Sequence, residues 1–152
     1  MEKEDESAGS SAANSGGVSH APVVDGVLKR LVRLANLGGG FSVTLLVDGM
    51  LVSGTLIAGR EYFSHITDGL RASSSPEAVK SVMIQLFEQM ASEYQEMLDQ
   101  PGGYDPRFIH LKDAAFFVPG GGPPILKKDG GTHWRGSLAS VSGFYFGLTT
   151  AS

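Results

Sequence analysis

Two β-branched segments joined by an Asp-Gly pair constrain the fold of this chain more than any other feature. Residues 41–48 read FSVTLLVD and residues 50–58 read MLVSGTLIA, with Gly49 between them. Alternating apolar and polar positions are typical of strands with one buried face, and Asp-Gly favours the tight turn of a β-hairpin. Gly54, inside the second run, predicts a bulge or a sharp bend. The chain is therefore predicted to contain a curved antiparallel hairpin.

A helix is predicted before the hairpin, over residues 22–37. Its apolar residues recur at intervals of three and four, and its basic residues fall toward the C-terminal half, where the helix dipole favours cations. Three glycines at 38–40 are expected to end it.

Two more helices are predicted after the hairpin. The first covers residues 60–71, and the second runs from Pro76 to about Asp99, with Ser74 or Ser75 as its N-cap. The second helix carries one long apolar stripe, made of Val79, Val82, Met83, Leu86, Phe87, Met90, Tyr94, Met97 and Leu98.

The rest of the chain is predicted to be β-structure. The expected segments are a strand at 107–118, single or kinked at Asp113, a Gly/Pro loop at 119–131, a strand at 132–140, a turn at 141–143 and a last strand at 144–149. The order predicts an α+β fold: a small curved antiparallel sheet or partly closed barrel with an N-terminal helix and a helical insertion. The segment from Val43 to Ala58 also resembles the first hairpin of Sm-like and SH3-like barrels.

Charge and composition divide the chain into a tail and one domain. Residues 1–20 are acidic and then rich in Ser, Ala and Gly, so we expect a disordered tail, followed by a single α+β domain over residues 21–150. The first 21 residues carry a net charge of −3 out of the total of −4, which leaves the domain nearly neutral. A nucleic-acid binder normally has a basic face, and none is evident here. The absence of cysteine, of a signal peptide and of a long apolar run favours the cytoplasm.

No set of residues in the sequence matches a catalytic or metal-binding motif. The four histidines, His20, His65, His110 and His133, lack metal-ligand spacing, and no Gly-x-Ser-x-Gly or phosphate-binding loop occurs. His110 is expected to be an ordinary hydrogen-bonded or exposed histidine. We therefore predict no enzymatic activity, no cofactor and no metal.

Aromatic residues gather near the C-terminus on strands that we expect to pair with each other. Alternation places Phe144 and Phe146 on one face of the last strand and Tyr145 on the other. One face is expected to belong to the core. The alternative is an exposed edge for self-association or contact with another protein, for which Tyr145 and Trp134 are the candidate residues.

Three segments together carry a resemblance to a known family. Residues 41–63 read FSVTLLVDGMLVSGTLIAGREYF, residues 107–117 read RFIHLKDAAFF, and residues 133–148 read HWRGSLASVSGFYFGL. In this order and at this spacing they resemble the GvpU family of gas vesicle accessory proteins.

The resemblance implies a non-catalytic accessory protein that influences the assembly, clustering or organisation of gas vesicles. Its expected partners are the vesicle shell, other gas vesicle proteins and further copies of itself, without nucleic acid or a lipid membrane. The expected location is the cytoplasm, at gas vesicles. The alternative is an Sm-like small barrel that binds RNA, for which the hairpin likeness speaks and the acidic pI of about 5.5 does not.

Overall fold

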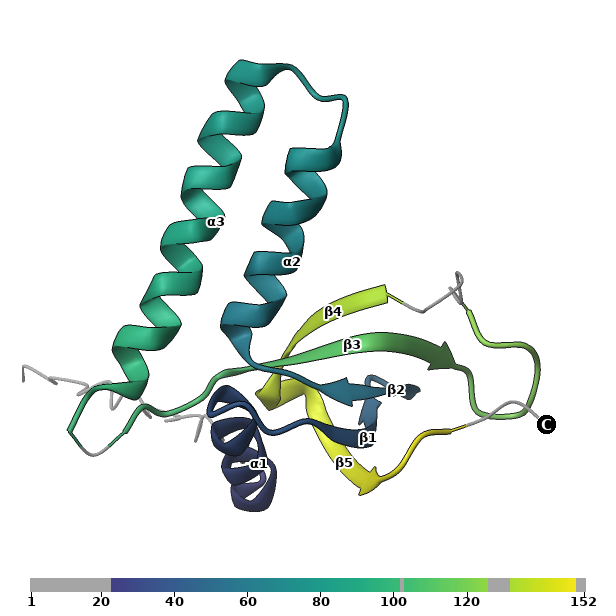
Figure 1. Ribbon diagram of the computed structural model, residues 1–152. Helices are drawn as coiled ribbons and strands as arrows, with labels where there is room; N and C mark the ends of the chain where they lie inside the picture. Colours follow the sequence, from purple (N-terminus) through teal and green to yellow (C-terminus); the bar gives the residue numbers. More distant parts are fainter. Residues whose placement is uncertain (1–22, 102, 126–131, 150–152) are drawn as a thin grey trace, which may run out of the picture.

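The computed structural model describes residues 23–101, 103–125 and 132–149. The predicted disordered tail at 1–20 lies outside these residues. The elements in chain order are α1 (Gly26–Asn36), β1 (Phe41–Val47), β2 (Met50–Leu56), α2 (Gly59–Ala72), α3 (Glu77–Leu98), β3 (Phe108–Phe117), β4 (Thr132–Ser137), the 3-10 turn η1 (Leu138–Ser140) and β5 (Val141–Phe146) (Figure 1). The predicted order of helices and strands is confirmed.

Helix α1 begins and ends through local interactions that its sequence encodes. The carboxylate of Asp25 accepts hydrogen bonds from the amides of Val27 at 2.7 Å and Leu28 at 3.2 Å, which satisfies two N–H groups of the first turn. Beyond the last turn, Gly38 has a φ of 106°, a conformation that glycine adopts at little cost.

The β1–β2 hairpin has the predicted turn. Asp48 and Gly49 have φ values of 49° and 78°, and Val47 lies opposite Met50, so the loop is a two-residue turn with both central residues in the left-handed region. Such a turn matches the twist of the two strands and fixes their register from Phe41–Leu56 to Val47–Met50.

A five-stranded antiparallel sheet in the order β4-β3-β2-β1-β5 forms the body of the protein. The register of β2 against β3 shifts between Ser53 and Thr55, and the register of β3 against β4 shifts beside Asp113, which has a φ of 52°. A Cβ at Gly54 would lie 2.9 Å from the carbonyl oxygen of Lys112, so the bulge brings two backbones closer than a side chain permits. The predicted bend at Gly54 and kink at Asp113 are confirmed.

The sheet is open, with β4 and β5 as its two edges, so the fold is a curved α+β sheet rather than a closed barrel. The apolar face of α1 packs on it. The core contains Leu28, Leu31, Val32, Ala35, Val43, Leu45, Val52, Leu56, Ile109, Leu111, Ala114, Leu138 and Val141.

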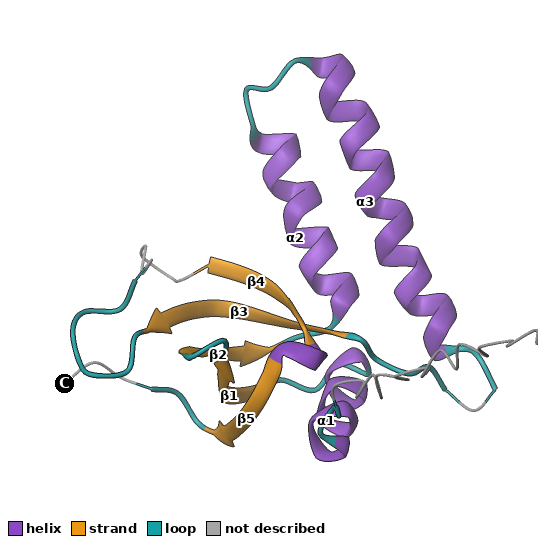
Figure 2. Ribbon diagram, turned by 180° about the vertical axis from the view of Figure 1, so that it is seen from behind, coloured by secondary structure: helices purple, strands orange, loops and turns teal. Residues whose placement is uncertain are grey.

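The insertion between β2 and β3 is a helical hairpin, which we call the arm (Gly59–Leu98). Figures 1 and 2 show from two sides that α2 and α3 lie alongside each other and project away from the sheet. The prediction of a serine N-cap for α3 is wrong: Pro76 occupies that position, and no side chain caps the helix. The carbonyl of Pro76 accepts the first hydrogen bonds of the helix instead, because the fixed φ of proline already suits a helix start.

The C-terminal strands differ from the prediction in two ways. β4 ends at Ser137, where the backbone enters η1, and β5 already begins at Val141, in the segment predicted to be a turn. β4 and β5 also do not pair with each other, because β3 takes β4 and β1 takes β5. The predicted pairing of the aromatic strands is therefore wrong.

Candidate interaction surfaces

Tyr145 lies on the edge strand β5, opposite Thr44 of β1, and its side chain is 48% exposed. Its hydroxyl is hydrogen-bonded to that of Thr149. The bonds from Thr149 and then from Thr44 lower the pKa of the Tyr145 phenol. The Thr44 hydroxyl donates a hydrogen bond to the Ser53 hydroxyl at 3.0 Å, and the Ser53 oxygen also accepts a hydrogen bond from the Thr149 amide at 2.8 Å. This polar network orients the ring while leaving it exposed.

The same edge of the sheet exposes apolar side chains. Phe146 is 62% exposed at the end of β5, Leu148 two residues later is also exposed, and so is Leu46 of β1, opposite Gly143. Phe144 points to the core, as the alternation predicts, and contacts Phe146 edge-on at 6.0 Å between ring centroids. We call Leu46, Tyr145, Phe146 and Leu148 the β5 edge. An edge strand with exposed aromatic residues offers both apolar surface and unpaired backbone groups.

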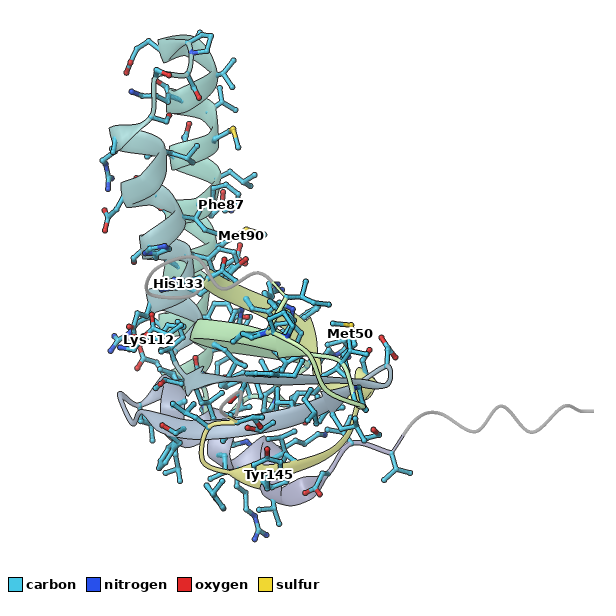
Figure 3. All side chains as sticks on the ribbon, turned by 90° about the vertical axis from the view of Figure 1, so that its right-hand side faces the viewer. Met50, Phe87, Met90, Lys112, His133 and Tyr145 are labelled. Atoms are coloured by element: carbon cyan, nitrogen blue, oxygen red, sulfur yellow. The ribbon has the colours of Figure 1, made fainter. Side chains whose placement is uncertain are left out.

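Trp134 lies on β4, in a different part of the sheet from Tyr145. It lies opposite Leu111 on β4, packs on the core and meets Phe116 edge-on at 6.4 Å between ring centroids. Its ring also covers Gly136, where a Cβ would lie 2.2 Å from the indole. His133, the residue before Trp134, and Tyr145 lie far apart in Figure 3, because β4 and β5 are the two opposite edges of the sheet. The structure thus does not bring the two candidate interaction residues together.

His110 is buried at the junction between the arm and the sheet. The Arg135 guanidinium donates a hydrogen bond to its Nε2 at 2.7 Å and another to the Tyr94 hydroxyl at 3.0 Å. Since arginine can only donate, Nε2 must be the acceptor and the proton must sit on Nδ1. Burial, and then the charge of Arg135, lowers the pKa of His110 to about 3, so the ring is neutral.

Aromatic rings complete this junction. Tyr62 and Phe63 of α2 and Tyr94 of α3 contact the His110 ring, with centroids 4.9 to 6.0 Å away. The guanidinium of Arg135 stacks 3.7 Å from the ring centroid of Phe108. The junction therefore joins both helices of the arm to β3 and β4. The prediction of a hydrogen-bonded histidine is confirmed, and sequence reasoning did not find its partner Arg135.

A pair of histidines lies where α2 of the arm meets β4. The rings of His65 and His133 stack with centroids 3.4 Å apart, and Glu61 lies 3.5 Å from the Lys112 ammonium nearby. Burial, and then the His65 ring, lowers the pKa of His133. Among the described residues, no three histidine, aspartate or glutamate side chains are placed to hold a metal ion.

An open pocket of about 310 Å³ lies between the end of α3 and the start of β3. It is lined by Tyr94, Met97, Tyr104, Asp105, Arg107 and Phe108. Two of its polar groups already have partners: Lys29 binds the Asp105 carboxylate at 2.7 Å, and Tyr104 is hydrogen-bonded to Asn36. Burial raises the pKa of Tyr104 to about 12, so this phenol stays protonated and is not a base at neutral pH.

Helix α3 exposes the largest apolar surface of the arm. None of its 22 residues is buried, although its sequence is rich in Val, Leu, Met and aromatic residues. Val79, Val82, Met83, Leu86 and Met97 are all exposed. Within the part of the chain that the structure describes, no helix is long and apolar enough to span a bilayer.

The described residues define an α+β protein that presents apolar surface on a projecting helical arm and on one sheet edge. A family model described as "Gas vesicle protein GvpU-like" matches residues 25–149. The chain therefore belongs to the GvpU-like family of gas vesicle proteins, as its three sequence segments predicted. No curated protein and no solved structure matches it.

Proposed function

We propose that this protein is a non-catalytic, cytoplasmic accessory protein that binds gas vesicles and associates with itself, so that it organises or clusters vesicles. The family match across residues 25–149 carries this proposal, because it covers every described helix and strand. The exposed apolar surfaces of the arm and the β5 edge support it, since patches of this kind are typical of sites that contact other proteins.

Charge and geometry also support a role through contact. The nearly neutral domain has little self-repulsion to oppose association. A gas vesicle presents many copies of its shell protein, so even weak contacts can hold an accessory protein by avidity. Tyr145 on the β5 edge is the residue that we propose contacts a partner, and Trp134 is proposed as the weaker candidate because its ring packs on the core.

Co-flotation with purified gas vesicles tests the proposal. Vesicles rise on centrifugation, so a bound protein moves to the top of the tube, while a free protein of 16.0 kDa does not. We expect the full chain to float with the vesicles and to increase their light scattering with its concentration. A chain that stays in solution at all concentrations would refute the proposal. Retention of single-stranded RNA on a filter at low salt would instead favour the small-barrel RNA-binding alternative.

A further inference from the structure

The apolar residues of α3 form two rows, and the described chain covers one of them. The inner row consists of Ile84, Phe87, Ala91, Tyr94 and Leu98, which are half-buried and recur at intervals of three and four; Lys80, also half-buried, precedes them on the same face. Phe87 and Tyr94 of this inner row contact Phe63 of α2, with ring centroids 6.0 and 5.8 Å apart. This spacing is that of a helix packed along one neighbour.

The second row precedes the first by one residue throughout. It consists of Val79, Met83, Leu86 and Met90, with Val82 beside it, and we call these five residues the outer row; Met90 is half-buried and the other four are exposed. Val82 is 67% exposed and Leu86 is 50% exposed. One residue corresponds to a rotation of about 100° around the helix, so the two rows face directions nearly at right angles.

Two apolar rows at this angle are what a helix needs when it contacts two neighbours in a four-helix bundle. The arm supplies one neighbour, α2. Figure 3 shows Phe87, of the inner row, and Met90, of the outer row, on the arm above the sheet, and the main contacts of the arm with the sheet are made by α2 rather than α3. A second helical hairpin would provide the missing neighbour.

We propose that the outer row of α3 binds the outer row of a second copy of this chain, in antiparallel orientation, to form a four-helix bundle from two arms. The proposal rests on the self-association in the proposed function and names the surface that performs it. A two-fold axis between Met83 and Leu86 brings Met83 of each copy to Leu86 of the other, and Val79 to Met90. Such an interface is self-complementary, as closed dimers require.

The charges on α3 favour the antiparallel orientation. The outer row from Val79 to Met90 carries no charge, whereas Glu93 and Glu96 follow in the next turns. Parallel helices would place each of these carboxylates beside its own copy, and like charges at close range are unfavourable. The antiparallel orientation moves Glu93 to the partner's α3 N-terminus, where no side chain caps the helix and the dipole favours an anion; Glu77 in the same turn is paired with Lys80, on the face of the inner row.

The area of the outer row predicts a weak, concentration-dependent dimer. Four of its side chains are 37% to 67% exposed and Met90 is half-buried, so the row offers on the order of 300 Å² of apolar surface per copy. Two copies together bury less than the roughly 1,200 Å² of a standard stable complex. A reversible contact of this size suits a protein that gains strength from many copies on one vesicle.

Light scattering coupled to size exclusion, applied to the full chain over a wide concentration range, tests the dimer. We expect the mass to rise from monomer to dimer for the unaltered chain. Leu86→Glu should weaken dimerisation at least tenfold, because it places a charge against Met83 of the partner. Gln85→Glu is the matched control: it adds the same charge to an exposed position one residue off the row and should dimerise normally. Circular dichroism verifies that both variants are folded.

The orientation has its own test, because the chain contains no cysteine. Single-cysteine chains carrying Val79→Cys and Met90→Cys are mixed and joined by a short bis-maleimide. Antiparallel packing predicts a mixed dimer of the two variants at several times the yield of either variant alone. Equal or greater joining of each variant with itself would overturn the antiparallel bundle.

Co-flotation separates failure of this inference from failure of the proposed function. Loss of the dimer in Leu86→Glu with vesicle binding retained supports the inference. A chain that is monomeric at all concentrations, or a Leu86→Glu chain that dimerises normally, overturns it even if vesicle binding persists. If the parent chain is monomeric and Leu86→Glu no longer binds vesicles, the outer row contacts the vesicle instead of a second copy, and the inference is overturned. A chain that dimerises through this row but never floats with vesicles refutes the proposed function and leaves the interface standing.

Discussion

The buried, neutral His110 predicts a loss of stability in mild acid. The pKa of His110 is about 3 in the folded chain and about 6.5 in an unfolded chain. Below pH 6.5 the ring is therefore protonated in the unfolded state while it stays neutral in the folded state. Stability is therefore complete above pH 6.5 and falls as the pH decreases toward 3. Between pH 7.5 and pH 5.0 the loss attributable to this one ring is about 2 kcal/mol.

The surroundings of His110 explain why protonation is so unfavourable. The aromatic rings of Tyr62 of α2 and Tyr94 of α3 face the imidazole of His110. The nearest charge is Arg135, whose guanidinium already donates to Nε2. A protonated ring would lose this hydrogen bond and would add a second positive charge to the same buried site. The junction between arm and sheet is then expected to open first as the pH falls.

His110→Gln provides the comparison, because the glutamine oxygen can accept from Arg135 and cannot be protonated in this range. Urea unfolding of the parent chain and of His110→Gln at pH 7.5 and pH 5.0 gives the two losses. The parent is expected to lose about 2 kcal/mol more than the variant. His65→Gln is the control, and it should keep most of the parent's pH dependence. The argument would be refuted by the same pH dependence of stability in His110→Gln and the parent, or by an NMR titration that places the pKa of the His110 imidazole near 6.

Three further substitutions test other parts of the description. Asp25→Ala removes the carboxylate that caps α1 and should cost about 1 kcal/mol of unfolding free energy in urea, whereas Asp25→Ser should cost less. Gly54→Ala forces a methyl group against the backbone of β3 and should cost about 1–3 kcal/mol in the same assay, while Gly143→Ala, at an open position, should not destabilise through steric contact. Tyr145→Ser should change the stability by less than about 1 kcal/mol, since the side chain is exposed, and should weaken vesicle co-flotation by about tenfold; unchanged flotation would remove Tyr145 from the proposed contact.

Local sequence signals predicted the elements of the fold well. Asp48-Gly49 determined the first hairpin, because few residue pairs adopt two consecutive left-handed conformations cheaply. Gly54 and Asp113 marked the bulges at the places where the strands bend. These signals are legible in sequence because each depends on the conformational preference of one or two residues.

Pairing between distant strands was not predictable in the same way. β4 and β5 are close in sequence and both aromatic, which favoured pairing them with each other, yet they form opposite edges of the sheet. Their partners are decided by packing of the whole core and by the turn at Leu138, whose amide binds the carbonyl of Arg107 at 2.9 Å. Such long-range terms leave no periodic pattern in the strands themselves.

The interaction surfaces were only partly visible in the sequence. Alternation along the last strand places Tyr145 on the other face from Phe144 and Phe146, which identified it as a candidate, and its side chain is exposed. The sequence pattern predicts a single apolar stripe on α3, whereas one row is half-buried against α2 and the other is mostly exposed. Periodicity shows where apolar residues lie around a helix, but it does not show which of them have a neighbour.

The place at which the arm joins the sheet determines how freely its length can change. β2 and β3 pair directly on either side of the insertion, with Leu56 opposite Leu111, so the sheet closes around the two ends of the arm without using the rest of it. A helix of 22 residues is about 33 Å long, and each added or removed turn changes this length by about 5 Å. The distance at which the protein holds whatever it touches can thus be adjusted turn by turn while the strands keep their register.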